Sequence, residues 1–293
     1  MVKVSFLGIG LMGLPMAQRL IGAGYSVTAY NRTATKLEKL SEVVNPKGSI
    51  AIAHTPAEAI AASDCVVLML TNAQAIRDVL HQADLSDRTI IQMSTISPDE
   101  SREICREVMA AGGAYLEAPV LGSIPEAKSG KLIVMVGAEP EQFEQWKPLL
   151  QTLGENPVLI GSVGSAATVK LALNQLIGSL TSAFAASLGL VLRQNVDVEA
   201  FMQIVRQSAL YAPTFDKKLQ RMIDRDFEHP NFPTKHLQKD MNLFVETAKS
   251  SNLDTASIEG VQQILQTAID RNLADLDYAA LFSVIVPEES KIH

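Results

Sequence analysis

Apolar residues in the first half of the chain gather in short runs that alternate with helical patterns. Runs of this length and composition are typical of buried strands, and they occupy residues 2–7, 26–30, 65–70, 89–93, 114–117 and 133–137, with a shorter candidate at 50–53. Amphipathic or helical stretches lie between them, at 34–44, from Thr55 onward, and at 73–80 and 98–111. Strands and helices that alternate in this way predict an α/β fold with a doubly wound, mainly parallel sheet.

From residue 165 onward the periodicity is helical almost throughout. The predicted helices span 165–194, 198–208, 215–223, 234–250 and 255–271. At 1.5 Å per residue the first of them would extend about 45 Å, which is long enough to cross a domain. The sequence therefore predicts two domains, a doubly wound α/β domain at 1–163 and an all-helical domain at 164–293.

Small residues lie along the longest predicted helix, at Gly178, Ser182, Ala185, Ala186 and Gly189. Small side chains let helices pack closely, because the distance between helix axes depends on the residues at the contact. These residues can pack against a second copy of the chain or inside one subunit, and the sequence leaves both possibilities open. A homodimer or homotetramer built through the helical domain is the expectation.

Composition and charge favour a soluble protein with small-molecule partners. Of the 293 residues, 47% are hydrophobic and 19% are charged, which favours substantial cores over disorder. The net charge of −7 gives no basic footprint for nucleic acid and no polybasic segment for a membrane surface. Residues 171–192 are long and apolar enough to resemble a membrane span, but several polar residues interrupt them. We expect a buried helix of a soluble domain there.

Cysteine usage and the N-terminus point to the cytoplasm. The two cysteines, Cys65 and Cys105, are too few for a disulfide framework, and Cys65 begins an apolar run typical of a buried strand. A strand pattern follows Met1 at once, without the pattern of a secretion signal. Five histidines show no pairing at i, i+4 and no cysteine partner at ligand spacing, so no metal site is predicted.

A glycine-rich turn directly after the first predicted strand indicates a dinucleotide site. Gly8, Gly10 and Gly13 form G-x-G-x-x-G, and a helical pattern follows that Gly24 closes. In such a turn the first glycine allows the tight bend, the second lets the backbone approach a pyrophosphate, and the third lets helix and strand pack closely. The free N–H groups at the start of the helix would face the phosphates.

The end of the second predicted strand indicates which dinucleotide is preferred. NAD-binding sites usually present Asp or Glu to the ribose 2′-OH at this point, but this chain has Asn31, Arg32 and Thr33. A guanidinium can pair with the 2′-phosphate of NADP(H), which a carboxylate would repel. The sequence therefore favours NADP(H), and the alternative is that Arg32 is an ordinary solvated surface charge.

Lys170 and Asn174 are the first candidates for chemistry. They lie four residues apart near the start of the longest predicted helix, so both side chains leave the same face just past the domain junction. A lysine placed there can exchange a proton with a substrate oxygen, while the carboxamide orients the ammonium or the substrate. Spacing alone favours the alternative of a surface lysine beside a polar helix residue.

Three further clusters contain candidate site residues. Ser94 and Thr95 follow a strand at the carboxyl edge where doubly wound sheets place ligands, although they are equally suited to cap the helix that begins near Pro98. In the segment 117–138 the chain turns at Gly122 and Ser123, where N–H groups can hold a carboxylate, unless this is an ordinary loop. In the segment 232–240, His236, Lys239 and Asp240 share a helical face, which a solvated charged surface would also explain.

Together these segments resemble the β-hydroxyacid dehydrogenase family, in its 3-hydroxyisobutyrate dehydrogenase-like group, from Met1 to about Val286. The matching segments are the G-x-G-x-M-G turn at 8–13, the Ser94-Thr95 strand end, the A-P-V-x-G loop at 118–123, the G-x-x-x-K-x-x-x-N helix start at 166–174 and the Lys239-Asp240 pair. The H-x-x-K-D form with Phe232-Pro233 upstream is most similar to the glyoxylate and succinic semialdehyde reductase branch. In two places the chain departs from the family pattern, since Leu121 stands where serine is usual and Ala166 where glycine is usual.

The resemblance implies a Rossmann domain and an NADP-dependent oxidoreductase that reduces small carboxylated aldehydes, such as succinic semialdehyde and glyoxylate, to hydroxy acids. It implies Lys170 as general acid and Asn174 as its orienting partner. The predicted contacts to NADP(H) are Gly8, Ile9, Gly10, Leu11, Met12, Gly13, Asn31, Arg32, Thr33, Leu70, Thr71, Thr95 and Lys239. The predicted contacts to the substrate are Ser94, Thr95, Leu121, Gly122, Ser123, Lys170, Asn174 and Phe232.

Two alternative functions stay open at this point. One is an enzyme that runs the reaction in the other direction and oxidises a 3-hydroxy acid such as 3-hydroxyisobutyrate. The other is a module that binds NADP(H), or serves as a scaffold, without turnover, because a fold alone does not establish a reaction. The presence of both Lys170 and Asn174 argues against the second alternative.

Overall fold

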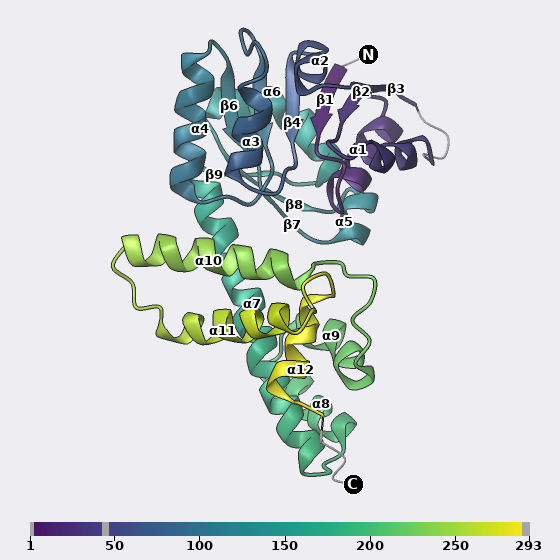
Figure 1. Ribbon diagram of the computed structural model, residues 1–293, viewed down its shortest axis with the longest axis vertical. Coiled ribbons are helices and arrows are strands. Elements are labelled where there is room, and N and C mark those ends of the chain that lie inside the picture. Colours follow the sequence, from purple (N-terminus) through teal and green to yellow (C-terminus); the bar gives the residue numbers. More distant parts are fainter. Residues whose placement is uncertain (1–2, 43–46, 289–293) are drawn as a thin grey trace. The chain divides into compact units, whose positions relative to one another are not determined.

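The computed structural model describes residues 3–42 and 47–288, and the chain divides into two compact units (Figure 1). The first is Met1–Lys170 and the second Leu171–His293. The division falls inside the long helix α7 (Ser165–Arg193), a short way beyond the position 163 at which the sequence suggested a boundary. One continuous helix therefore supplies residues to both units.

The first unit is built on a sheet with the strand order of a dinucleotide-binding fold. Six parallel strands lie in the order β3-β2-β1-β4-β5-β6. They are β1 (Lys3–Leu7), β2 (Ser26–Tyr30), β3 (Ile50–Ile52), β4 (Cys65–Leu68), β5 (Thr89–Gln92) and β6 (Ala114–Glu117). The order reverses between β1 and β4, and ligands of doubly wound sheets bind outside the carboxyl ends of the strands at this reversal.

Beyond β6 the sheet continues with mixed direction. The strand β8 (Ile133–Gly137) runs antiparallel to β6 and to the two-residue strand β7 (Val120–Leu121), and parallel to β9 (Val158–Gly161). The sequence indicated β8 but neither β7 nor β9. The strand β7 has only two residues, too few for a recognisable run. The strand β9 contains the apolar residues Val158, Leu159 and Ile160, which were a signal for a strand, although the structure leaves it partly exposed.

Helices cover both faces of the sheet in the first unit. On one face α1 (Gly13–Ala23) contacts α5 (Ile124–Ser129) and α6 (Pro140–Leu153), and on the other α2 (Pro56–Ala61), α3 (Ala73–Leu80) and α4 (Pro98–Ala110) pack in sequence. Each face has its own apolar core, because successive strand residues point to opposite sides. In β4, Cys65 and Val67 belong to one core, and Val66 and Leu68 to the other.

The segment expected to be amphipathic at 34–44 is not an α-helix. It forms two short 3₁₀ segments, η1 (Ala34–Lys36) and η2 (Glu38–Glu42), and residues 43–44 lie outside the described part of the chain. Leu37 and Leu40 are buried while their neighbours are exposed, which is the three-residue repeat of a 3₁₀ turn.

In the second unit the named elements of the described residues are all helices. After α7 come α8 (Val198–Gln207), α9 (Pro213–Asp224), α10 (Thr234–Ser250), α11 (Ala256–Asp270), η3 (Tyr278–Leu281) and α12 (Phe282–Ile285). The helices α10 and α11 pack side by side and enclose, with η3 and α12, a core of Leu, Met and Phe side chains. The prediction of an all-α second half is confirmed.

The long helix α7 is less buried than the sequence suggested. It is long and apolar enough to cross a membrane, and 33% of its most apolar 18-residue window is buried. One face packs inside the unit, where added Cβ atoms at Gly178 and Gly189 would lie 2.9 Å from Met241 Sδ and 2.2 Å from Val286 Cγ2. On the other face Leu176 and Leu190 are 50% and 65% exposed. The expectation of a buried helix is therefore correct for one face and wrong for the other.

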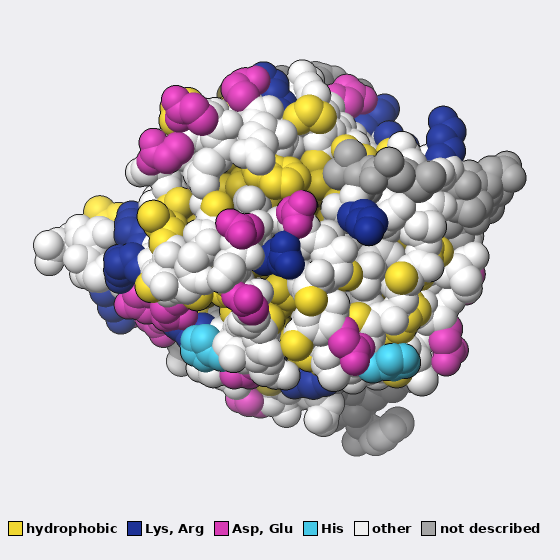
Figure 2. All heavy atoms as spheres, turned by 90° about the horizontal axis from the view of Figure 1, so that it is seen from above, with side chains coloured by type: hydrophobic (Ala, Val, Ile, Leu, Met, Phe, Trp, Pro, Cys, Tyr) yellow, Lys and Arg dark blue, Asp and Glu magenta, His cyan; other side chains and the backbone are white. Residues whose placement is uncertain are grey.

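Charged residues are dispersed over the surface seen in Figure 2. Side chains of both signs lie among polar and apolar ones over this face. This distribution agrees with the modest net charge of −7.

Candidate cofactor and catalytic site

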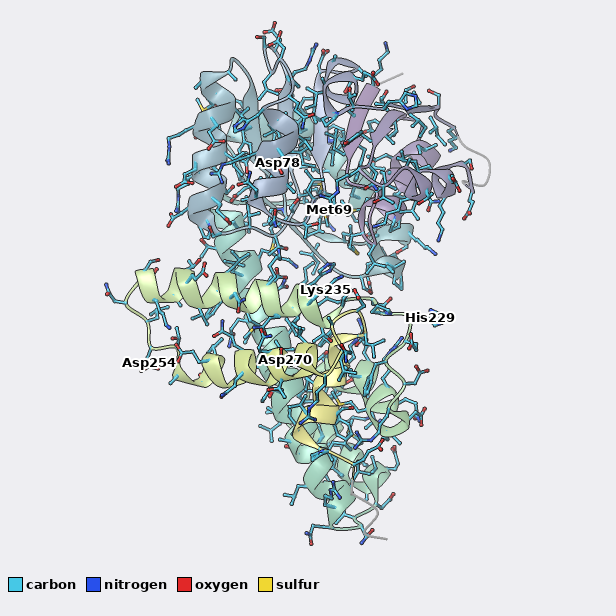
Figure 3. All side chains as sticks on the ribbon, in the orientation of Figure 1. Met69, Asp78, His229, Lys235, Asp254 and Asp270 are labelled. Atoms are coloured by element: carbon cyan, nitrogen blue, oxygen red, sulfur yellow. The ribbon has the colours of Figure 1, made fainter. Side chains whose placement is uncertain are left out.

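The turn between β1 and α1 requires glycine at its first and last positions. Gly8 has a φ of +103°, and an added Cβ would lie 2.2 Å from the carbonyl oxygen of Met69, the residue after β4 that Figure 3 labels. An added Cβ at Gly13 would lie 1.9 Å from the carbonyl oxygen of Gly8. Strand, turn and helix therefore pack at backbone distance, as the sequence predicted for these two glycines.

The middle of the same turn is open, in a form that fits a dinucleotide. An added Cβ at Gly10 would meet no atom within 4 Å, so the backbone there faces free space. The N-cap residue of α1, Met12, offers no side-chain acceptor, and the first turn contains no acidic residue. The partial positive charge at the start of α1 is thus available to an anion such as a pyrophosphate. Leu11, 40% exposed, lies in this turn between Gly10 and Met12.

Asn31 connects this turn to the end of β2. Its Oδ1 accepts a hydrogen bond of 3.0 Å from the N–H of Ile9, and its Nδ2 donates one of 2.8 Å to the carbonyl oxygen of Thr33. An aspartate here would still accept from Ile9 but would turn its second oxygen toward the carbonyl of Thr33. The neutral carboxamide therefore suits the local structure and also keeps negative charge away from this corner.

Arg32 is an exposed cation next to Asn31. Within the described parts of the chain no acidic side chain lies within ion-pair distance of its guanidinium, and Thr33 next to it is exposed as well. A guanidinium at the end of β2 fits an additional phosphate at the ribose of the dinucleotide. An ordinary surface arginine would be exposed in the same way, so the pairing of Arg32 with a phosphate stays a prediction.

Ser94 has a clear structural role at the ends of β4 and β5. Its side chain is buried, and its Oγ accepts a hydrogen bond of 2.7 Å from the N–H of Leu70, while its own N–H donates to Oε1 of Gln92. The suggestion that Ser94 or Thr95 caps the next helix is wrong, because Ser97 is the N-cap of α4 and forms a capping box with Glu100.

Thr71 and Thr95 lie at the same ends of the sheet. Thr71 is exposed and Thr95 half-buried, in the segments that follow β4 and β5. Both therefore stand at the carboxyl edge, at or next to the reversal of strand order. Their contacts to cofactor or substrate, like that of Ser94 to substrate, remain predictions.

In the predicted substrate loop, a carboxylate of the protein itself, that of Glu126, accepts hydrogen bonds from Ser123. Leu121 is half-buried on β7, and Gly122 has a φ of +138°, where an added Cβ would lie 2.7 Å from Leu132 Cδ2. Ser123 then donates from its N–H at 2.8 Å and from its Oγ at 2.5 Å to the same oxygen of Glu126. A substrate carboxylate at this turn must replace Glu126 at the Ser123 N–H or use other donors of the loop.

The second unit contains a polar cluster around Asp240. Its Oδ2 accepts a hydrogen bond of 2.6 Å from Nδ2 of Asn174, and its Oδ1 lies 3.0 Å from Nζ of Lys239. Asp240 and Asn174 are 2% and 1% exposed. The remaining carboxamide oxygen of Asn174 accepts no hydrogen bond from the described residues. An acceptor one turn of α7 beyond Lys170 is therefore available to an ammonium or a hydroxyl group.

This cluster corrects one alternative from the sequence. Asp240 on this face is buried and contacts Asn174 and Lys239, so the face is not a solvated charged surface. Sequence reasoning proposed Lys239 as a site residue but left out Asp240, although its place next to that lysine in the Lys239-Asp240 pair was a signal. What the sequence cannot show is the contact with Asn174.

Phe232 lies just before α10, and His236 lies in its first turn. The ring of Phe232 meets that of Tyr278 edge-on at 5.8 Å between centroids, and that of His236 at 6.4 Å. Burial lowers the pKa of His236, and the neighbouring Lys239 and Lys235 lower it further. The imidazole is thus held neutral more strongly than a free histidine. Phe232 is anchored from within the unit, and its contact with a substrate remains a prediction.

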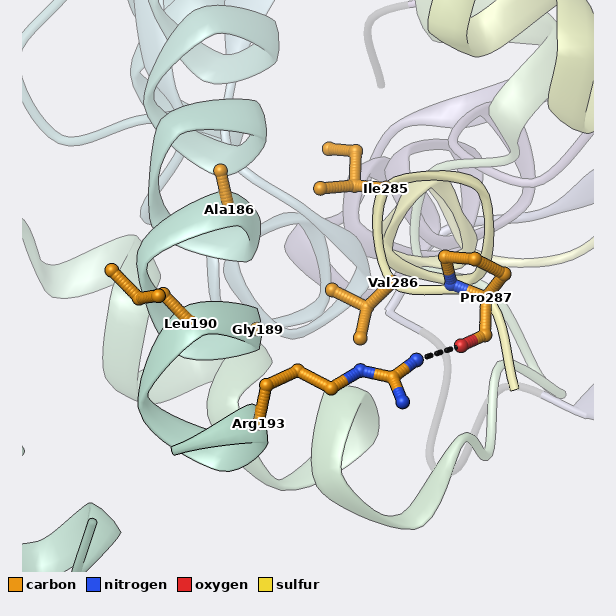
Figure 4. Close-up of a pocket in the computed structure, with 7 residues that line it drawn as sticks. All are labelled: Ala186, Gly189, Leu190, Arg193, Ile285, Val286 and Pro287. Carbon is orange, nitrogen blue, oxygen red and sulfur yellow. Dashed lines mark hydrogen bonds between the residues drawn. The ribbon is translucent and has the colours of Figure 1, made fainter. Parts of the chain in front are cut away.

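A separate pocket of about 310 Å³ lies elsewhere in the second unit (Figure 4). It is lined by Ala186, Gly189, Leu190, Arg193 and residues 285–287, and Arg193 donates a hydrogen bond to the carbonyl oxygen of Pro287. None of the residues predicted to bind cofactor or substrate lines it. The pocket is therefore separate from the residues predicted to bind cofactor or substrate in either unit.

Comparison with known proteins agrees with these features. Residues 3–161 match the family model of the NAD binding domain of 6-phosphogluconate dehydrogenase. Residues 164–285 match the model described as NAD-binding of NADP-dependent 3-hydroxyisobutyrate dehydrogenase. The two models together span both halves of the described chain.

Two relatives of known name are similar over almost the whole chain. The chain is 32% identical over 293 residues to 2-hydroxy-3-oxopropionate reductase of Escherichia coli (strain K12), covering 97% of each protein. It is 31% identical over 296 residues to glyoxylate/succinic semialdehyde reductase 2, chloroplastic, of Arabidopsis thaliana, covering 99% of this chain and 81% of that protein.

Among solved structures, the Mycobacterium tuberculosis 3-hydroxyisobutyrate dehydrogenase with L-serine has the same fold. The TM-score is 0.86 at 22% identity, with 97% of this chain and 99% of that one covered. The glycine turn, the strand order and the two family models identify an NAD(P)-binding domain, and both named relatives are reductases. The chain belongs to the β-hydroxyacid dehydrogenase family, in its 3-hydroxyisobutyrate dehydrogenase-like group, and is an NAD(P)-dependent oxidoreductase of hydroxy acids and their carbonyl counterparts.

Proposed function

We propose that this chain reduces short aldehydes that carry a carboxylate, with succinic semialdehyde and glyoxylate as the leading substrates, NADPH as the reductant and Lys170 as the general acid. The observation that carries the proposal is the placement of Lys170 and Asn174 one turn apart on α7, with Asn174 fixed by the buried Asp240. Both named relatives are reductases of small aldehyde acids, which agrees with this chemistry.

The proposed reaction needs no covalent intermediate with the protein. NADPH, when bound, supplies the hydride that reduces the aldehyde carbon. The ammonium of Lys170 gives a proton to the carbonyl oxygen and stabilises the negative charge that develops there. Asn174, held by Asp240 through its Nδ2, keeps its Oδ1 in place to orient the ammonium or the substrate.

The preference for NADPH over NADH follows from the end of β2. Arg32 is an exposed cation at the position where an acid would bind an unphosphorylated ribose, and Asn31 beside it is neutral and occupied with the glycine turn. A guanidinium paired with a phosphate forms two charge-assisted hydrogen bonds, which NADH cannot accept.

The preference among aldehyde acids depends on the loop after β7. We infer that Thr95, Gly122 and Ser123 contact the substrate carboxylate. Leu121 in place of the family's serine removes a hydroxyl donor and adds apolar surface, which favours the methylene groups of succinic semialdehyde over the bare glyoxylate. The longer aldehyde acid is therefore the proposed preferred substrate.

A spectrophotometric panel tests the proposal. NADPH oxidation by the purified chain would be followed with succinic semialdehyde, glyoxylate and 2-hydroxy-3-oxopropionate, and NADP⁺ reduction with 3-hydroxyisobutyrate. We expect the highest kcat/KM for succinic semialdehyde in the reductive direction. Turnover of 3-hydroxyisobutyrate alone would assign the oxidative reaction instead, and no turnover of any of these compounds would contradict the proposal.

We also infer that the chain forms a homodimer or homotetramer. The outward face of α7 carries exposed apolar and small residues, namely Ala172, Leu176, Leu180, Ala183 and Leu190. A continuous apolar stripe along a helix favours burial against another surface, and a second copy of the same helix supplies a matching one. Light scattering on wild type and on Leu176→Glu tests this, and a monomeric wild type would contradict it.

A further inference from the structure

Glu117 makes an unusual set of contacts at the end of β6. It is fully buried, and its Oε1 accepts hydrogen bonds from three backbone N–H groups at the start of α7. The donors are Gly164 at 2.8 Å, Ala166 at 2.9 Å and Ala167 at 3.1 Å. One carboxylate oxygen thus satisfies N–H groups that the first turn of a helix leaves without an intrahelical partner.

The second carboxylate oxygen of Glu117 belongs to a buried series of hydrogen-bonded side chains. Ser101 of α4 donates to Oε2, and the Ser101 hydroxyl lies 2.9 Å from that of Tyr115. Burial raises the pKa of Glu117, whereas the hydrogen bonds from Ser101 and from the start of α7 oppose that effect and favour the carboxylate. A negative charge at this point also interacts favourably with the positive end of the 29-residue α7.

The surrounding backbone is shaped to admit this carboxylate. Gly137 pairs with Glu117 across β6 and β8, and an added Cβ at Gly137 would lie 2.4 Å from Oε1. Gly164 has a φ of +99°, a conformation that turns its N–H toward Glu117 and that other residues rarely adopt. Two glycines therefore serve the same contact, which indicates that the position of the first turn of α7 is tightly set.

The catalytic lysine of the proposed function follows on the same helix. Lys170 lies three residues after Ala167 and four after Ala166, so its side chain leaves the helix on the side that these residues define. A displacement of the reacting groups by about 1 Å can cost on the order of 10²-fold in rate. Whatever fixes the first turn of α7 to the sheet therefore also fixes the origin of Lys170.

We propose that Glu117 is a positioning residue for catalysis, which holds the start of α7 at the end of β6 and thereby sets the position of Lys170. This inference rests on the role proposed for Lys170. The glycine turn that fits the cofactor belongs to β1 and α1, separated from β6 by β4 and β5 in the sheet. Loss of the Glu117 contacts should therefore affect the chemical step and leave cofactor binding intact.

The test compares Glu117→Gln with Ser101→Ala in the full chain. Glutamine keeps an acceptor of similar shape but replaces charge-assisted hydrogen bonds with neutral ones, which are about half as strong. Ser101→Ala removes a neighbour of the carboxylate and leaves the three contacts to α7 in place. For both variants the Tm, the Kd for NADPH by fluorescence, kcat and KM would be measured with the best aldehyde acid.

We expect Glu117→Gln to lower kcat about tenfold, with the NADPH Kd and the substrate KM within about twofold of wild type. Ser101→Ala should keep kcat within about twofold of wild type, even if its Tm falls as much as that of Glu117→Gln. An unchanged kcat in Glu117→Gln overturns the inference. Parallel losses of kcat in both variants at equal loss of Tm overturn it too, because they would reflect stability alone.

A double variant separates this inference from the proposed function. If Glu117 acts through Lys170, Glu117→Gln should add no further loss in a Lys170→Ala background. An equal additional loss in that background overturns the inference while the role of Lys170 stands. Activity of Lys170→Ala close to wild type would instead defeat the proposed role of the lysine.

Discussion

Asn174 on α7 donates a hydrogen bond of 2.6 Å from its Nδ2 to Oδ2 of Asp240 on α10, 66 positions later in the chain. The same carboxylate holds Lys239 through its other oxygen. Because Asn174 has only its Oδ1 left to accept a hydrogen bond, the contact fixes which end of the carboxamide faces the site. Asp240 thus decides the orientation of Asn174, which lies one turn beyond Lys170 on the same helix.

Replacement of Asp240 by asparagine tests this arrangement. The new amide would turn its NH₂ toward either Asn174 or Lys239, and both of those groups are donors. We expect kcat to fall about tenfold or more, the scale of one lost hydrogen bond to a charged group. Asp270→Asn on α11 is a matched control, because among the described residues that carboxylate accepts a side-chain hydrogen bond from Gln266 on its own helix. A wild-type kcat in Asp240→Asn would show that the orientation of Asn174 is not needed.

Cofactor preference tests the role of Arg32. Arg32→Asp places a negative charge where the 2′-phosphate is expected, so kcat/KM should reverse from favouring NADPH to favouring NADH. The control is Arg106→Asp, the same charge change at an exposed position on α4. Equal use of both cofactors by the wild type, or an unaltered ratio in Arg32→Asp, would refute the assignment.

Substrate length tests the departure at Leu121. Leu121→Ser restores a hydroxyl that can donate to a short carboxylate, and it removes apolar surface worth about 0.8 kcal/mol per buried CH₂ of a longer substrate. We expect the ratio of kcat/KM for glyoxylate to that for succinic semialdehyde to rise roughly tenfold. Ile52→Ser, at the far edge of the sheet on β3, supplies the control. Unchanged ratios would mean that Leu121 does not face the substrate.

Stability at mildly acidic pH tests the state of His236. Its pKa is lowered by burial and by Lys239 and Lys235, against the opposing effect of Asp240 and Asp275. Between this lowered pKa and the ordinary value of about 6.5, the unfolded chain binds more protons than the folded one. The contribution of the neutral His236 to the free energy of unfolding is therefore fully present above about pH 6.5. It is lost as the pH falls toward the pKa of His236 in the folded protein.

We expect His236→Gln to lose less Tm than the wild type between pH 7.5 and pH 5.5. His54→Gln replaces an exposed histidine and should behave like the wild type. Identical pH dependence in His236→Gln and wild type would show that this histidine is protonated as easily in the folded state as in the unfolded one.

Helices and strands with local end signals could be predicted from the sequence. The helix predicted at 73–80 has these bounds in the structure, where Asn72 caps it and accepts a hydrogen bond of 2.9 Å from the N–H of Ala75. The bounds of α10 also agree with the prediction, since a residue with fixed φ, Pro233, precedes Thr234. In both cases the information lies within a few residues of the helix end.

The helix α6 could not be recognised in the same way. Its buried residues Phe143, Leu149, Leu150 and Leu153 face the sheet, but charged and amide residues and the internal Pro148 obscure the apolar stripe. The stripe becomes visible only when the sheet that it covers is known. The segment E-P-E-Q at its start, which forms a capping box, was the available signal.

Long-range contacts define what sequence reasoning missed in the site. Glu117 and Asp240 are acidic residues, which are usually exposed, and the adjacent Lys239 was the local signal for Asp240. The contacts of Glu117 with the start of α7 span 47 to 50 positions, and that of Asp240 with Asn174 spans 66. The glycine turn, by contrast, is a local motif, and the structure shows the backbone contacts that its first and last glycines were predicted to allow.

The most direct test of the account is the activity of Lys170→Ala. We predict that the variant binds NADPH with nearly the wild-type Kd by fluorescence, while kcat for the best aldehyde acid falls on the order of 10²-fold or more. Lys235→Ala, which removes a lysine paired with Asp275 at the start of α10, should retain wild-type kcat. If Lys170→Ala keeps its activity within a few-fold of wild type, Lys170 is a structural residue, and the proton comes from another group, with His236 and Lys239 the next to test.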